Sequence, residues 1–205
     1  MERPVPAPPP SSPASTAAQV RARHPQTLLT LTAEHAPVEH ASVLEALRPD
    51  TRAALDGAAA ATWLPMAIDI EVIEAVAERL GPRGTAALVE KRQREEMGSA
   101  LFDGFVQTAL RVFAASPVNM VKRLPAGWGH LFRNAGWIEV VSTGRSNAVT
   151  RFHRLPRECT SSAAWMAALP VGLRTLYEIV GAKGTVECRF EDASQETVLV
   201  TFRWR

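Results

Sequence analysis

Histidines and glutamates are the residues whose chemistry could support a metal centre or acid–base catalysis. The densest group is Glu34-His35 and Glu39-His40. Two histidines five residues apart do not have the spacing that places both on one helix face, so this group does not predict a metal site. Three further glutamates follow a helical period and indicate the solvated face of an amphipathic helix. They are Glu71, Glu74 and Glu78.

Two cysteines are the candidate thiol nucleophiles. Cys188 alternates with Val186 and Phe190, which predicts a buried side chain that behaves as a small hydrophobe. Cys159 lies in a loop and has no histidine near it in the sequence to activate it. The chain also lacks a glycine-rich phosphate loop and a nucleophile-elbow motif. We therefore predict a non-enzymatic protein with no catalytic residue, metal or cofactor.

Tryptophan is over-represented among the aromatic residues, with five copies against one tyrosine. Each tryptophan falls at a junction between the predicted helical half and the predicted sheet. One interpretation is a buried seam between the two layers, and the other is a ligand pocket at that seam, lined by aromatic rings. The candidate ligand-binding residues are Trp63, Trp128 and Trp165; the remaining two are Trp137 and Trp204.

Arginines gather around one predicted hairpin, at positions 145, 151, 154 and 157. A nucleic-acid-binding surface could use such a patch, with Phe152 available for stacking. The net charge is only +2, however, and twenty of the 23 basic residues are arginine, so some clustering is expected from composition alone. Nucleic acid is therefore not an expected partner.

Residues 1–26 are rich in proline, alanine and serine and contain few large apolar side chains. Such a segment cannot offset the entropy that it loses on ordering, so we predict a disordered tail followed by a single domain over residues 27–205. No apolar leader and no stretch long enough to span a membrane is present. With only two cysteines, the sequence favours a cytoplasmic protein.

The segment 41–135 predicts a helical half. Just before it, the short apolar run 28–32 is expected to form a lone strand or an extended arm. Asp69 is the expected N-cap of a helix that runs to Leu80. Gly81-Pro82 then supplies a stop signal.

A second, longer helix is expected from Thr85 to about Phe113, with residues 91–96 as its solvated, charged face. Ser116-Pro117 is a strong helix start, because a capping serine precedes a proline in the first helical position. This helix is expected to end near Leu124-Pro125, and a short helix over 126–134 is expected to follow it.

From Trp137 onward the hydrophobic period changes from that of a helix to that of a strand. Residues 137–205 predict a hairpin, a helix that starts at Ser161 or Ser162 and is split at Pro170, and a second hairpin. Strict alternation in the last two strands predicts an antiparallel sheet with one buried face. The expected fold class is α+β, with the helical half packed on a four-stranded antiparallel sheet.

A block of residues from Ser116 to Val140 resembles a family of uncharacterised bacterial proteins that occurs in large paralogous sets. The resemblance covers about residues 40–205. Its motifs are Ser116-Pro117, Leu124-Pro125, Trp128, Phe132-Arg133, Gly136-Trp137, Trp63-Leu64-Pro65 and Trp204.

The order of the elements is also similar to the α+β fold of 4-vinyl-reductase-type sensor domains, haem-NO-binding domains and transport-particle subunits. This resemblance implies a fold and a ligand-binding or partner-binding role, but no chemistry. The cysteine cluster of some of these sensors is missing here. A haem-ligand histidine in matching context is missing as well.

Taken together, the residues and the resemblance predict a non-enzymatic binding or regulatory module. We expect it to form a homodimer and to take a small apolar ligand or a protein partner. A scaffold that meets a partner through the solvated sheet face or the long helix is the alternative. An enzyme of unrecognised type and a nucleic-acid binder rank below both.

Overall fold

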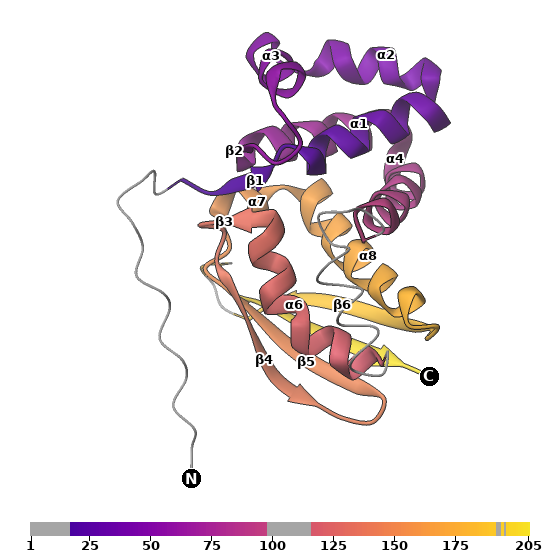
Figure 1. Ribbon diagram of the computed structural model, residues 1–205, viewed down its shortest axis with the longest axis vertical. Coiled ribbons are helices and arrows are strands. Elements are labelled where there is room, and N and C mark those ends of the chain that lie inside the picture. Colours follow the sequence, from indigo (N-terminus) through magenta and orange to yellow (C-terminus); the bar gives the residue numbers. More distant parts are fainter. Residues whose placement is uncertain (1–16, 98–115, 192–193, 195) are drawn as a thin grey trace.

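The computed structural model describes residues 17–97, 116–191, 194 and 196–205. It confirms the α+β fold, since a helical half lies against one face of a four-stranded antiparallel sheet (Figure 1). Residues 1–16 of the predicted tail lie outside the described part. No helix within the described part is long and apolar enough to cross a membrane.

The helical half contains five described helices. The first of them corrects the prediction of a strand or arm over 28–32. Leu28 and Leu31 are both buried and stand three residues apart, and the Thr32 hydroxyl donates to the Leu28 carbonyl at 2.7 Å. A run of five residues is too short to tell a strand period from a helical one. The helices are α1 (Arg23–His35), α2 (Pro37–Ala46), α3 (Pro49–Gly57), α4 (Met66–Met97) and α6 (Pro117–Leu131).

A small three-stranded sheet, which the sequence did not predict, lies inside the helical half. Its central strand β1 (Gln19–Arg21) pairs antiparallel with β2 (Trp63–Pro65) on one side and β3 (Phe132–Arg133) on the other. Val20 in the central strand is fully buried. Regular structure therefore begins by residue 19, inside the range that the composition assigned to the tail, because one apolar residue among polar ones hardly changes a composition average.

Helix α4 contains the predicted stop signal as a sharp bend. Gly81 has φ 65° and ψ 178°, a backbone conformation that glycine adopts readily and other residues avoid. Pro82 follows it, and the Thr85 hydroxyl donates to the Gly81 carbonyl at 2.8 Å. The two arms of α4 therefore run in different directions. Asp69 lies inside the first arm, which begins at Met66, so its prediction as the N-cap was wrong.

The C-terminal half is the predicted hairpin, helix and hairpin. Its four strands are ordered β4-β5-β7-β6, and each neighbouring pair is antiparallel. The Ser162 hydroxyl accepts from the backbone N–H of Trp165 at 3.3 Å, as expected of the helix start. The elements are β4 (Trp137–Thr143), β5 (Asn147–His153), α7 (Arg157–Ser161), α8 (Ala163–Ile179), β6 (Gly184–Phe190) and β7 (Val198–Trp204).

Two predicted helix breaks at prolines are wrong. Helix α6 continues through Pro125 to Leu131, and α8 continues through Pro170. Ser116 does cap α6, because its hydroxyl accepts from the Asn119 N–H at 3.2 Å. A proline removes one helical hydrogen bond, and tertiary packing can override that local cost.

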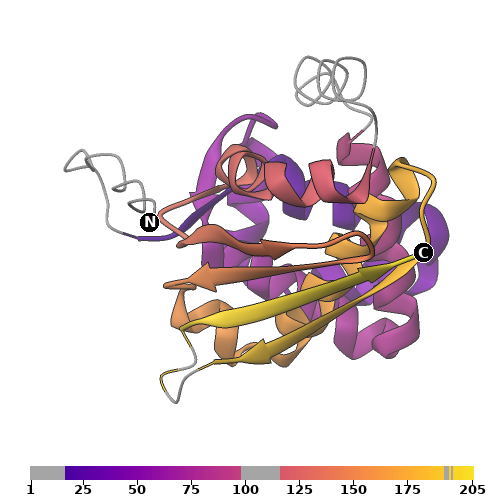
Figure 2. The same cartoon turned by 90° about the horizontal axis from the view of Figure 1, so that it is seen from below.

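The four-stranded sheet has one buried and one solvated face. Phe152 and Phe202 point toward the helices and are fully buried. On the opposite face Arg151 donates to Glu139 at 3.1 Å and to Glu191. In Figure 2 the sheet lies in front of the helices, and no described helix covers its outer face. The alternation in the sequence predicted the two faces, but on the edge strand β6 the predicted burial is incomplete, since Cys188 is only partly buried and Phe190 is 39% exposed.

Candidate functional site

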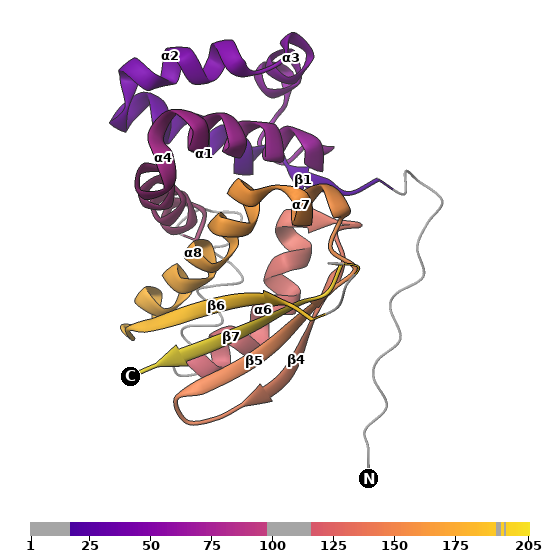
Figure 3. The same cartoon turned by 180° about the vertical axis from the view of Figure 1, so that it is seen from behind.

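A cavity of about 130 Å³ lies between the bent helix α4, helices α6 and α8, and the inner face of the sheet. It sits between two packed layers, where ligand sites often lie. Figure 3 shows these helices from the opposite side of the molecule. Most of the wall is apolar. Side chains that form it include Ile73, Met97, Met120, Leu124, Leu169 and Leu173.

One end of the cavity is charged, where His24 and Arg92 line it and two carboxylates lie beside them. Nδ1 of His24 is 2.7 Å from Oε1 of Glu96, and its Nε2 is 3.9 Å from Oδ1 of Asp69. Nη1 of Arg92 lies 3.7 Å from the same Asp69 oxygen. None of the four side chains is more than 6% exposed. We call His24, Asp69, Arg92 and Glu96 the buried ionic cluster.

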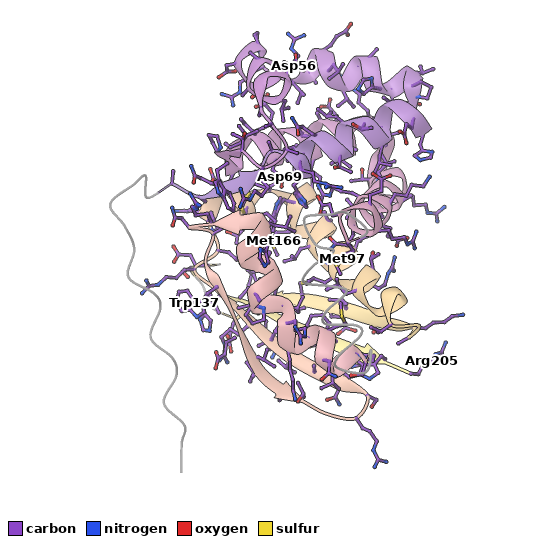
Figure 4. All side chains as sticks on the ribbon, viewed as in Figure 1. Asp56, Asp69, Met97, Trp137, Met166 and Arg205 are labelled. Atoms are coloured by element: carbon purple, nitrogen blue, oxygen red, sulfur yellow. The ribbon has the colours of Figure 1, made fainter. Side chains whose placement is uncertain are left out.

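The bend in α4 is what brings this cluster together. On a straight helix Asp69 and Arg92 would lie about 35 Å apart, from the rise per residue. The turn at Gly81 instead folds the second arm back, so that the two side chains meet. Figure 4 shows Asp69 where the upper helices meet α7 and α8. A single backbone conformation therefore determines the geometry of the charged end.

The protonation of Glu96 depends on the cluster. Burial raises the pKa of its carboxyl, but the charge and hydrogen bond of His24, followed by the charges of Arg92 and Arg23, outweigh that effect and hold the pKa below its usual value. Glu96 is therefore an anion at neutral pH. An ionised carboxylate in this position needs its cationic neighbours, because burial without them would cost several kcal/mol.

Arg92 keeps unused hydrogen-bonding capacity. Its Nε and Nη1 atoms are buried and make no hydrogen bond with any residue that the structure describes. The distance of 3.7 Å to Asp69 is too long for a direct hydrogen bond, so this pair attracts through charge alone. Arg92 is thus a buried cation at one end of the cavity, which Gln93 and Arg123 also line.

Two of the three predicted tryptophans line the cavity. Trp165 also donates from Nε1 to Oδ2 of Asp69 at 3.3 Å, and Trp128 donates to the Ala135 carbonyl at 3.3 Å. Both indole N–H groups are therefore occupied, and these residues offer the cavity their apolar surface. Trp63 does not line it.

Trp63 lies in the small sheet instead, where two guanidinium groups flank its ring. The Cζ atoms of Arg21 and Arg133 lie 3.9 Å and 4.4 Å from the ring centroid. Cation–π contacts of this kind hold β1, β2 and β3 together. The placement gives Trp63 a role in stabilising the small sheet.

The other residues that could take part in acid–base or thiol chemistry are paired at the surface or removed from solvent. Glu71 was predicted to face solvent, but it accepts from the Arg48 backbone N–H at 2.6 Å and from the Thr51 hydroxyl at 2.7 Å. Burial raises the pKa of Cys159 far above its usual value and that of Cys188 to about 12, so neither thiol ionises at neutral pH. No group of three or more potential metal ligands occurs in the described ranges.

The buried ionic cluster was not predicted from the sequence. Residues 91–96 were expected to form a solvated face, yet Arg92 and Glu96 are buried. A signal was present, since Arg92 and Glu96 follow Leu88 at steps of four and therefore share its buried stripe. His24 lay inside the predicted tail, and Asp69 was interpreted as a cap.

Comparison with known proteins identifies the fold but no sequence family. No family model and no curated protein matches the chain. Solved structures of H-NOX proteins are similar over 90% of this chain. The Fe(II) unliganded H-NOX protein from K. algicida has a TM-score of 0.62 at 6% identity and is covered over 96% of its length. The H-NOX protein from S. oneidensis in the Fe(II)NO ligation state has a TM-score of 0.57 at 8% identity, with 99% covered.

These likenesses confirm the haem-NO-binding type of fold that the element order indicated. At such low identity they concern the fold alone. No family model matches the chain, so the resemblance to an uncharacterised bacterial family stays a prediction. The likeness to 4-vinyl-reductase-type domains and transport-particle subunits stays a prediction.

Proposed function

We propose that this protein is a non-enzymatic binding module that takes a small, mainly apolar ligand in the cavity beside the buried ionic cluster. The observation that carries the proposal is a mostly apolar cavity that ends at the buried ionic cluster, where His24 and Arg92 line it. The H-NOX type of fold supports it, because the S. oneidensis neighbour is described in a ligated state.

The form of the cavity supports a binding role. It is concave, lies between two packed layers and is lined mostly by apolar side chains, as small-molecule sites usually are.

The free-energy cost of burying the ionic cluster also supports a binding role. Apolar side chains of similar volume are often more stable by about 1–4 kcal/mol than a buried ion pair. His24, Asp69, Arg92 and Glu96 therefore do not represent the most stable way to fill this region. They give the cavity a polar end that can orient a ligand.

Haem does not fit the described residues. A cavity of about 130 Å³ is close to the roughly 150 Å³ that holds a single benzene ring, whereas haem has four pyrrole rings. The histidine that lines the described cavity is His24, whose two nitrogens face Glu96 and Asp69 at 2.7 and 3.9 Å. A histidine holds haem iron only through an imidazole nitrogen that is free to coordinate it.

Thermal shift measurements with small apolar compounds test the proposal. We expect benzene-sized compounds to raise the melting temperature with increasing concentration, because they bind the folded state only. Ala168 lines the cavity, and Ala168→Leu should fill part of it and abolish the shift. Ala167→Leu is the matched control, since Ala167 is the exposed neighbour on the same helix.

Native mass spectrometry of the purified protein gives a second test, because it reports a carried ligand directly. Equal binding by a correctly folded Ala168→Leu variant and by the wild type would exclude this cavity as the site. If no compound shifts the melting temperature and no ligand is carried, the small-molecule role is wrong.

A protein-interaction role is the second candidate. Trp137 and Val141 on the edge strand β4 are 42% and 43% exposed, and Figure 4 shows Trp137 at the outer margin of the sheet. Exposed apolar side chains on an unpaired strand edge favour contact with another chain. The predicted homodimer is tested by light scattering of the wild type beside Trp137→Glu. A strict monomer in both cases would contradict it.

A further inference from the structure

Strand β6 forms one edge of the four-stranded sheet. It pairs with β7 over residues 184–190 without a register shift, and no described strand pairs with its other side. Figure 2 shows it at the lower margin of the sheet. Strand β4, at the opposite edge, has a bulge between Val140 and Ser142. A bulge is one of the features by which proteins protect a free edge from pairing, and β6 lacks it.

The inner face of β6 is less well covered than that of its neighbour. The three inward side chains of β7 are all fully buried. Their partners on β6 are not, since Phe190 is 39% exposed and Val186 and Cys188 are only partly buried. A further strand beside β6 would continue the sheet and cover these side chains.

Backbone hydrogen bonds show which residues present donors and acceptors at this edge. The Glu191 N–H donates to the Thr197 carbonyl at 2.9 Å, and the Arg205 N–H donates to the Lys183 carbonyl at 3.0 Å. Because such bonded pairs alternate along an antiparallel ladder, the odd-numbered positions of β6 bond to β7. The N–H and carbonyl groups at positions 186, 188 and 190 therefore point to the free edge, where another strand can pair with them.

The charges on the outer face of β6 are complementary to themselves. Glu187 and Arg189 are both exposed, and they stand two residues apart on that face. A second β6 can run antiparallel to the first with the two Cys188 residues opposite each other. Each Glu187 then lies opposite an Arg189, each Val186 lies opposite a Phe190, and the free backbone groups meet.

Other registers lack this match. A shift of two residues would place Glu187 opposite Glu187, or Arg189 opposite Arg189, and like charges directly opposite each other destabilise a sheet. A shift of one residue would set the outer face of one strand against the inner face of the other. The sequence of β6 thus specifies one way of pairing with its own copy.

We propose that two copies of this chain associate through residues 185–191 and form one antiparallel sheet of eight strands, four from each copy, about a two-fold axis. The inference rests on the protein-interaction candidate of the proposed function. It identifies the partner as a second copy and leaves Trp137 on β4 outside the interface. It is independent of the ligand in the cavity. The charge pairs set the register, while the backbone bonds and the covered Val186 and Phe190 supply the affinity.

Charge reversal in the full-length protein tests the register. Arg189→Glu would place like charges opposite each other at both symmetry-related positions, and we expect it to weaken the dimer by roughly tenfold or more. Adding Glu187→Lys to that variant brings opposite charges together again and should restore the dimer. Light scattering over a series of protein concentrations measures the association, and circular dichroism checks that each variant is folded.

Two variants serve as controls for charge and for position. Arg145→Glu makes the same change of charge at an exposed residue in the turn between β4 and β5, so it should stay dimeric. Trp137→Glu alters the opposite edge of the sheet and should stay dimeric as well.

Cysteine cross-linking tests the proximity of the two strands. Positions 187 and 189 of opposite copies would form a pair without backbone bonds, with Cα atoms about 4.5 Å apart, which is within the range of a disulfide. We expect a covalent dimer when Glu187→Cys protein is mixed with Arg189→Cys protein under mild oxidation. Either protein alone should give much less, because identical positions would lie about 7–8 Å apart. Wild type gives the background from the native cysteines.

The remaining outcomes overturn different parts of the proposal. A dimer that Arg189→Glu leaves intact, or that the double charge reversal fails to restore, excludes the β6 interface while the homodimer stands. Loss of the dimer in Trp137→Glu places the interface on β4 instead. Equal cross-linking in the mixture and in either variant alone excludes the register. A strictly monomeric wild type contradicts the interface and the homodimer together, and the ligand-binding role is decided separately by its thermal shifts.

Discussion

Nδ1 of His24 lies 2.7 Å from Oε1 of Glu96, so a buried contact joins the first turn of α1 to the last turn of α4. Both side chains are almost fully enclosed. Through this contact the start of the ordered chain is fixed to the helix arm that lines the cavity. The strength of the contact and its dependence on pH can both be measured.

Removing one partner of this pair should be more harmful than removing both. Glu96→Leu leaves His24 and Arg92 with less compensation, and we expect a loss of about 3–5 kcal/mol in the free energy of unfolding. His24→Leu with Glu96→Leu should recover part of that loss. Urea denaturation of the single and double variants measures the coupling. Additive losses would show that the contact contributes nothing of its own.

Acid should weaken the fold partly through Glu96. Its folded-state pKa lies below the value of about 4.3 expected in the unfolded chain, so the ionised carboxylate stabilises the fold above that pH. This contribution is lost as the pH falls through the lowered folded value. The urea midpoint of the wild type should therefore fall more steeply below about pH 4 than that of Glu96→Gln. Parallel curves for the two proteins would contradict this assignment.

Gly81→Ala should destabilise the domain by about 1–3 kcal/mol, because alanine is strained at φ 65° and ψ 178°. Space is not the cause, since a Cβ at Gly81 would meet nothing within 4 Å. Gly57→Ala is the control, because Gly57 also has open space around it but no positive φ. Equal stability of the two variants in thermal unfolding would mean that the bend tolerates a side chain.

The cavity-lining tryptophan should matter for binding, and the one in the small sheet should not. We expect Trp128→Phe to weaken the binding of benzene-sized compounds by about threefold to tenfold, because it loses wall area and the bond to Ala135. Trp63→Phe should leave the affinity unchanged, since Trp63 contacts Arg21 and Arg133 instead. Calorimetry on both variants decides the matter, and a larger effect at Trp63 would place the ligand elsewhere.

Both thiols should be inert in the folded protein. Burial raises the pKa of Cys188 to about 12, and burial together with Asp69 and Glu158 raises that of Cys159 further. Neither should react with a thiol reagent at neutral pH until the chain is unfolded in denaturant. Fast labelling of native protein, located by peptide mass, would identify an accessible cysteine.

Local sequence patterns predicted the C-terminal half well because its strands alternate strictly. Each residue of β7 has a fixed face once the period is known, and Phe202 and Trp204 are indeed buried. Helix breaks were less predictable. Pro125 and Pro170 both lie inside continuous helices, since packing against neighbours outweighs the local cost of a proline.

The charged end of the cavity could not be predicted from local patterns. His24, Asp69 and Glu96 come from separate stretches, and only the bend at Gly81 together with the packing of α1 brings them together. A charged residue in a helix is usually solvated, so Arg92 was assigned to the surface. Tertiary contacts decided its burial. Trp128 and Trp165 were candidates from the sequence and do line the cavity, and their role in binding stays a prediction.

The cluster also bears on how the chain folds. The Trp165–Asp69 bond spans 96 positions of sequence, and the His24–Glu96 bond spans 72. Contacts of such long range form only after the intervening loops have closed, which slows folding and places these bonds late in it. Neither the helices nor the C-terminal half alone can complete them. We therefore expect the domain to unfold in one cooperative transition, with the buried charges exposed all at once.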